Sequence, residues 1–71
     1  MMQSVVSLGI GDRLRRLRRE RLLTQHGLAE KAGISHITIA RIETGQVEPR
    51  IGTIRKLAKA LDVDPTEFLG E

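Results

Sequence analysis

Apolar side chains recur every three or four residues along most of the chain, and no segment shows the strict polar–apolar alternation of a strand. This spacing, together with the capping and terminating residues between the apolar runs, predicts helices over residues 12–23, 25–32, 36–44, 51–61 and 65–69. The expected fold is therefore all-α, a compact domain of five short helices.

The first predicted helix is strongly amphipathic, with Asp12 as its expected N-cap. Its apolar side carries Leu14, Leu17 and Leu22, and arginines fill most of the positions between them. Residues 1–11 are uncharged and form an apolar lead-in, so the folded domain is expected to cover residues 12–70.

The link between the second and third helices is very short. Gly33 is expected to end the second helix in a left-handed conformation, and only Ile34 separates it from Ser35, the expected N-cap of the third. Two helices joined so closely cannot lie antiparallel, and a steep crossing through a turn that contains glycine is typical of a helix-turn-helix.

The third helix has two unlike sides when it is drawn at 100° per residue. Ile39 and Ile42 face inward together with Ile34. The opposite side contains no acid and carries His36, Ile37, Ala40, Arg41 and Thr44. A solvated surface would favour lysine and glutamate there, whereas an open side without acids suits the major groove of DNA.

Four of these side chains are predicted to read bases. Arg41 can donate two hydrogen bonds to guanine, Ile37 can contact a thymine methyl group, and Ala40 allows close approach. His36 can donate either to guanine or to a phosphate oxygen.

The backbone of the DNA is expected to be held elsewhere. The N-terminal ends of the second and third helices, at Thr24, Gln25 and Ser35, offer free amide groups and positive dipole ends to phosphate. Thr44 is also expected to reach the backbone, and Arg13 either contacts phosphate or lies in solvent.

Composition narrows the classes of function. The chain has 71 residues, which is one domain, a net charge of +3, and no cysteine for disulfides or thiolate ligands. Six arginines crowd residues 13–21, and a basic cluster suits nucleic acid or an anionic membrane. The apolar residues 5–10 are too few to cross a bilayer, so a cytoplasmic protein is expected. His26 and His36 are not at a metal-ligand spacing, and neither a metal nor a cofactor is expected.

The pattern of residues resembles the Cro and lambda-repressor type of helix-turn-helix, the Xre family, over about residues 12–69. The resemblance rests on Gln25, Leu28, Ala29, Gly33, Ile34, Ser35, Ile39, Arg41, Ile42, Glu43, Gly45 and Pro49, and on Ile54, Leu57, Ala58, Ala60, Leu61, Val63, Phe68 and Leu69. It implies a lambda-repressor-like domain of five helices that binds a specific operator, usually as a two-fold dimer.

The resemblance also assigns roles to single positions. It gives base reading to His36, Ile37 and Arg41, and backbone or supporting contacts to Thr24, Gln25, Ser35 and Arg50. It further suggests that Arg18 pairs with Glu43. Gly27, Ile37 and Arg50 depart from the residues common in the family, and Ile37 means that a relative's base preference cannot be copied.

The leading hypothesis is a sequence-specific transcriptional regulator, a repressor or an activator with the repressor favoured, that binds a palindromic operator as a homodimer with residues 35–44 in the major groove. The alternative is a protein-interaction module, antitoxin-like or an adaptor. An enzyme is the weakest option, since no nucleotide loop, metal constellation or nucleophile–base pair is present. Arg15, Arg16 and Arg19 are interpreted as a solvated face. Three roles remain open for Val5, Val6, Leu8 and Ile10, which are disorder, packing on the domain, and pairing of two subunits.

Overall fold

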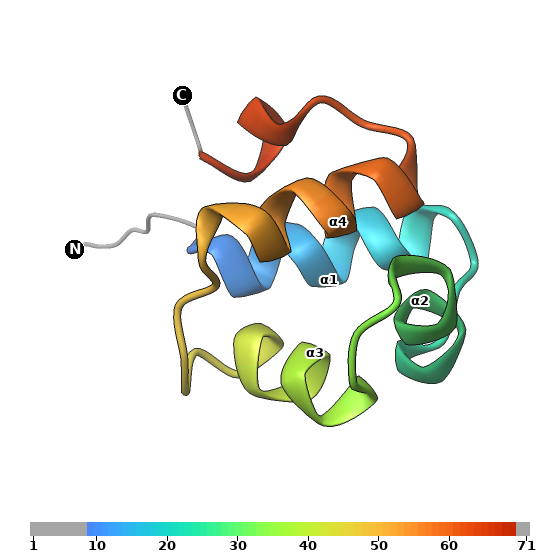
Figure 1. Ribbon diagram of the computed structural model, residues 1–71, viewed down its shortest axis with the longest axis horizontal. Helices are drawn as coiled ribbons and strands as arrows, with labels where there is room; N and C mark the ends of the chain where they lie inside the picture. Colours follow the sequence, from blue (N-terminus) through green and yellow to red (C-terminus); the bar gives the residue numbers. More distant parts are fainter. Residues whose placement is uncertain (1–8, 70–71) are drawn as a thin grey trace, which may run out of the picture.

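Four α-helices and a final turn of 3-10 helix make up residues 9–69, the part of the chain that the computed structural model describes (Figure 1). The elements are α1 (Ile10–Glu20), α2 (Gln25–Ala32), α3 (His36–Glu43), α4 (Ile51–Leu61) and η1 (Pro65–Phe68). The expected all-α class is therefore confirmed. The count of five α-helices is not, because the last element is a 3-10 turn.

The first helix begins earlier and ends earlier than its sequence pattern predicts. Its N-cap is Gly9, and Asp12 lies in its first turn, so the assignment of Asp12 as the N-cap is wrong. The helix stops at Glu20, and Leu22 follows in a left-handed conformation with φ 57°. Leu22 is 93% exposed, which also overturns its placement on the apolar side.

The caps of the helix-turn-helix are those that the sequence predicts. The Thr24 hydroxyl oxygen accepts from the Gly27 N–H at 2.9 Å, and the Ser35 hydroxyl oxygen accepts from the Ile37 N–H at 3.1 Å. Gly33 ends α2 at φ 71°, a region that L-residues avoid, so the chain turns directly from α2 into α3. Arg50 precedes α4 without a side-chain cap, as its residue type predicts.

A single apolar core lies where the helices meet. Figure 1 shows α3 and η1 on opposite sides of α1, and both of them pack against this helix. The core consists of Leu14, Leu17, Leu28, Ala29, Ile39, Ile42, Ile54, Leu57, Ala58, Leu61 and Phe68. Ile10 packs against this core, while Val5, Val6 and Leu8 lie outside the described residues. No helix within residues 9–69 is long and apolar enough to cross a membrane.

The short last element closes the core from the side opposite α3. Asp64 caps it by accepting from the Thr66 N–H at 2.9 Å, and Pro65 occupies its first position. Phe68 is only 1% exposed. A single 3-10 turn is therefore sufficient to bury the one aromatic ring outside the histidines.

Candidate nucleic-acid interface

The two sides of α3 differ as its sequence predicts. Ile39 and Ile42 are 0% and 1% exposed, so they hold the helix to the core. On the outer side Ile37 is 52% exposed, Arg41 is exposed and Ala40 is half-buried. The outer side therefore presents a small residue between an exposed apolar residue and an exposed cation.

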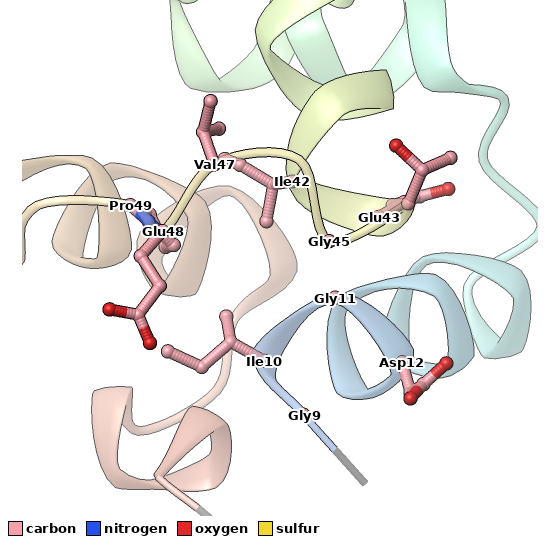
Figure 2. Close-up of a pocket in the computed structure, with 11 residues that line it drawn as sticks. Gly9, Ile10, Gly11, Asp12, Ile42, Glu43, Gly45, Val47, Glu48 and Pro49 are labelled. Carbon is pink, nitrogen blue, oxygen red and sulfur yellow. The ribbon is translucent and has the colours of Figure 1, made fainter.

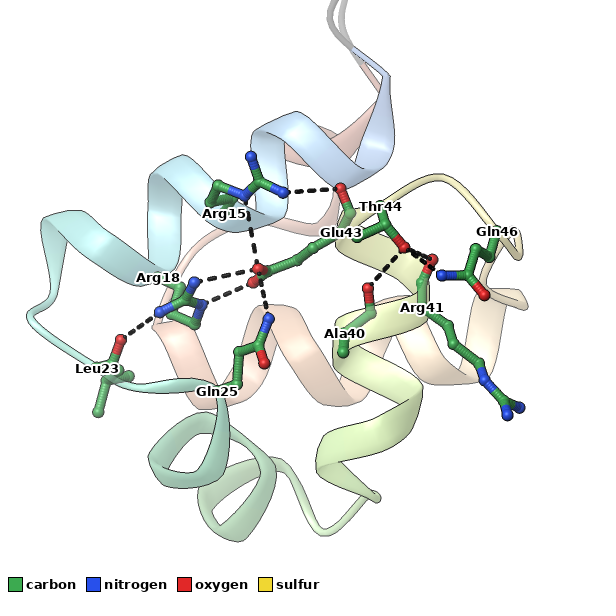
Figure 3. Close-up of polar contacts among 9 residues, drawn as sticks. All are labelled: Arg15, Arg18, Leu23, Gln25, Ala40, Arg41, Glu43, Thr44 and Gln46. Atoms are coloured by element: carbon green, nitrogen blue, oxygen red, sulfur yellow. Dashed lines mark hydrogen bonds and ion pairs between the residues drawn. The ribbon is translucent and has the colours of Figure 1, made fainter.

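The one acid of α3, Glu43, is turned away from this outer side. Its carboxylate receives Arg18 Nε at 2.7 Å on Oε2, and Arg18 Nη2 at 3.1 Å and Gln25 Nε2 at 3.1 Å on Oε1. Figure 3 shows Arg15, Arg18 and Gln25 converging on Glu43 from two other helices. The Arg18–Glu43 pair that the resemblance implied is thus present, and it joins α1 to α3.

Arg18 and Arg15 extend this network. Arg18 also donates from Nη1 to the Leu23 carbonyl at 2.7 Å, which ties the start of α2 to α1. Arg15 Nε lies 3.7 Å from Glu43 Oε1, and its Nη2 donates to the Glu43 carbonyl at 3.4 Å. Interpreting Arg15 as part of a solvated face therefore missed its contact with α3.

This network sets the pKa of the Glu43 carboxyl group. Burial alone raises the pKa of its carboxyl, but hydrogen bonds from Arg18 and Gln25, with the charges of Arg18 and Arg15, outweigh burial and lower the pKa below its ordinary value. The Arg18 guanidinium has its own pKa raised by the hydrogen bond to Glu43. Glu43 therefore stays ionised, and its charge is neutralised inside the domain.

The predicted backbone-contacting residues lie at the ends of helices. Thr24 and Ser35 are N-caps whose backbone precedes the free amide groups of α2 and α3, and Arg50 is the exposed N-cap of α4. The Gln25 side chain is already bonded to Glu43, so its main-chain N–H at the first position of α2 is the group that remains for an anion.

Thr44 and Arg13, the other two residues predicted to contact the DNA backbone, lie in different surroundings. Thr44 donates to the Ala40 carbonyl at 3.0 Å and accepts from Gln46 Nε2 at 3.0 Å. Its hydroxyl is therefore held against the end of α3. Arg13 is half-buried in the first turn of α1.

One contact at this surface was not foreseen from the sequence. The imidazole rings of His26 and His36 stack with centroids 3.9 Å apart and an angle of 24° between their planes. Both side chains are exposed, as predicted for His26. The two residues lie on different helices, so only the angle between α2 and α3 could have revealed the contact.

A pocket at the start of α1 does not add a catalytic arrangement. It lies between Gly9, Ile10 and the segment from Val47 to Pro49 (Figure 2). Figure 2 shows the carboxyls of Asp12 and Glu48 on opposite sides of the chain at Ile10, so they do not converge. Within residues 9–69 no group of three or more His, Asp or Glu side chains is placed to hold a metal ion.

Sequence comparison gives consistent relatives. The family model described as Helix-turn-helix, HTH_3, matches residues 14–68. The immunity repressor protein of Bacillus phage phi105 is 39% identical over 62 residues, which are 87% of this chain and 43% of that protein. The HTH-type transcriptional repressor RghR of Bacillus subtilis is 48% identical over 54 residues, which are 75% of this chain and 40% of RghR. The chain thus spans less than half of either relative.

Solved structures agree with the sequence relatives. The restriction-modification controller protein C.AhdI of Aeromonas hydrophila superimposes with a TM-score of 0.81 at 39% identity, covering 83% of this chain and 89% of that one. The P22 c2 repressor, solved with synthetic operator 9T, gives a TM-score of 0.80 at 28% identity, covering 86% and 92%. With its steeply joined α2 and α3 and a family match over most of its length, the chain belongs to the HTH_3 helix-turn-helix family, of the Cro and lambda-repressor (Xre) type.

Proposed function

We propose that this protein is a sequence-specific, DNA-binding transcriptional regulator, a repressor, which inserts α3 into the major groove. The observation that carries the proposal is the exposed, acid-free outer side of α3, whose inner side is held by buried isoleucines and by the Glu43 network. The phage and Bacillus relatives named as repressors support the same function, as does the P22 repressor solved with an operator.

Each outer residue of α3 has a distinct role in this proposal. Arg41 donates to guanine O6 and N7, Ile37 contacts a thymine methyl group, and His36 donates to a base edge. Ala40 allows the helix backbone to approach. Phosphates are held by the N-terminal ends of α2 and α3 at Thr24, Gln25 and Ser35, with Thr44, Arg50 and Arg13 contributing further backbone contacts.

The protein binds a palindromic operator as a homodimer in this proposal. Large apolar side chains are exposed outside α3 at Val47, Ile51 and Leu69, and they offer a second copy apolar surface to cover. A two-fold dimer on DNA places the two α3 helices in successive major grooves, with half-sites about 34 Å apart. Sedimentation equilibrium should then show a dimer. Operators in which the spacing between half-sites is lengthened by half a helical turn should bind poorly.

The decisive experiment selects bound DNA from a random pool and then measures the affinity of variants by fluorescence anisotropy. Arg41→Ala should cost about 1–3 kcal/mol on the selected site and relax the preference at one base pair. Lys59→Ala is the matched control, because it removes an exposed cation from α4 rather than α3. Equal losses on selected and unrelated DNA would show that Arg41 supplies charge and reads no base.

A further inference from the structure

The stacked histidines form a contact that core packing does not require. His26 and His36 are both exposed, yet their ring centroids lie 3.9 Å apart with nearly parallel planes. At this separation the two rings are in van der Waals contact over their faces. Stacking uses the faces of the imidazoles and leaves the nitrogens on their edges available for hydrogen bonds.

The geometry of the turn brings these rings together. His26 and Ala29 lie at i and i+3 on one face of α2 and line a groove together with the C-cap Gly33 and His36. Ala29 adds only a methyl group to this groove. The left-handed Gly33 turns the chain so that the first residue of α3 lies beside this groove.

We propose that His26 is a positioning residue for DNA recognition, which holds the His36 imidazole with its edge toward a base pair in the major groove. The inference rests on the proposed function. An imidazole already held by stacking loses less side-chain freedom when it binds, so its hydrogen bond to guanine O6 or N7 is stronger and more selective. His26 thereby sets base preference without contacting a base.

The test compares His26→Ala with His26→Phe in the full chain, on DNA selected by the wild-type protein. His26→Ala should lose about 2- to 12-fold discrimination, the range of a stacked aromatic pair, at the single base pair where His36→Ala also loses it. His26→Phe keeps a ring in place and should restore discrimination. Glu30→Ala removes a different side chain of the same groove and leaves both imidazoles in place, so it should leave base preference unchanged.

Two further measurements separate positioning from folding. His26→Ala should shift the His36 ring proton resonances of the free protein by loss of the ring current, while the domain stays folded. The double variant His26→Ala, His36→Ala should discriminate no worse than His36→Ala alone. A uniform loss at every base pair, unaltered discrimination in His26→Ala, or no rescue by His26→Phe would overturn the role of His26. Failure of the wild-type protein to enrich any DNA would instead overturn the proposed function, and this inference with it.

Discussion

The Arg18 guanidinium and the Glu43 carboxylate form a two-pronged pair between α1 and α3, with N–O distances of 2.7 and 3.1 Å. The two residues are 9% and 4% exposed. A bidentate pair of this kind has defined geometry as well as charge. It therefore determines how α3 is oriented on the domain, in addition to keeping its acid away from the outer side.

Removing one partner of this pair should be costly. Glu43→Ala leaves the Arg18 charge buried without its partner, and we expect a loss of about 3–5 kcal/mol in the free energy of unfolding, measured by urea denaturation. The control is Glu20→Ala, which breaks the exposed pairs of Glu20 with Arg16 at 3.9 Å and with Arg21 at 3.7 Å and should cost less than about 1 kcal/mol. Similar losses in the two variants would contradict the importance of burial.

Acid should weaken the domain through the same carboxyl. Because the pKa of Glu43 is lower in the folded state than in the unfolded chain, its contribution is complete above the ordinary glutamate pKa of about 4.3. That contribution is lost as the pH falls through the lowered value. We expect the free energy of unfolding to fall between about pH 5 and pH 3, with a shallower slope in Glu43→Gln.

Part of this acid sensitivity should survive in Glu43→Gln. Hydrogen bonds from the Thr66 backbone N–H and side chain also lower the pKa of Asp64, which adds a dependence of the same sign. Asp64→Asn should remove that remainder. If neither substitution changes how steeply the free energy of unfolding falls with pH, other groups control acid unfolding.

Gly11 should tolerate no side chain. A Cβ there would collide with the Ile42 carbonyl oxygen and lie 2.9 Å from the Glu43 carbonyl oxygen, which are backbone atoms that cannot move aside. Gly11→Ala is expected to lower the thermal midpoint, with a loss of about 1–3 kcal/mol. Gly52→Ala in α4 meets open space and should instead gain about 0.5–1 kcal/mol.

Leu22 is a position where a change to glycine should stabilise the domain. Its left-handed backbone costs about 1–2 kcal/mol for an L-residue, and its 93% exposed side chain recovers little by packing. Leu22→Gly should therefore raise stability by about 0.5–1 kcal/mol, measured by thermal and urea unfolding. Leu22→Ala keeps the backbone cost and should give no such gain, so equal gains would show that side-chain exposure is the cause.

The proposed contact between Ile37 and a thymine methyl group can be tested by changing the DNA. Replacing the contacted thymine of a selected site by deoxyuridine removes one methyl group and should cost the wild-type protein about 0.8 kcal/mol in binding free energy. Ile37→Ala should bind the two DNAs almost equally. An equal cost for deoxyuridine at a thymine outside the site, or persistence of the cost in Ile37→Ala, would argue against the contact.

Local signals in the sequence predicted much of the fold. Thr24, Gly33 and Ser35 specify the bounds of the helix-turn-helix because capping and left-handed turns depend on neighbouring residues. The start of α1 was missed because Gly11 belongs inside the helix for a long-range reason, its close approach to α3. Leu22 was misplaced because its apolar character suggested a helix that had already ended.

The candidate site, like the fold, was predicted from the sequence only in part. The exposed side of α3 followed from helical periodicity alone, through residues such as Ile37 and Arg41. Two partners of Glu43 did not, since Arg15 and Gln25 lie 28 and 18 residues away and nothing in their local sequence indicates the contact. The stack of His26 on His36 likewise depends on the angle between two helices.

The side chains that attach α3 to the domain are different from those on its outer side. Ile39, Ile42 and Glu43 bind the helix to the rest of the domain, whereas Ile37 and Arg41 contribute little to that attachment. Under the proposed function, changes on the outer side can therefore alter the DNA sequence that is recognised while the domain keeps its stability. Such a scaffold can diversify its targets one side chain at a time.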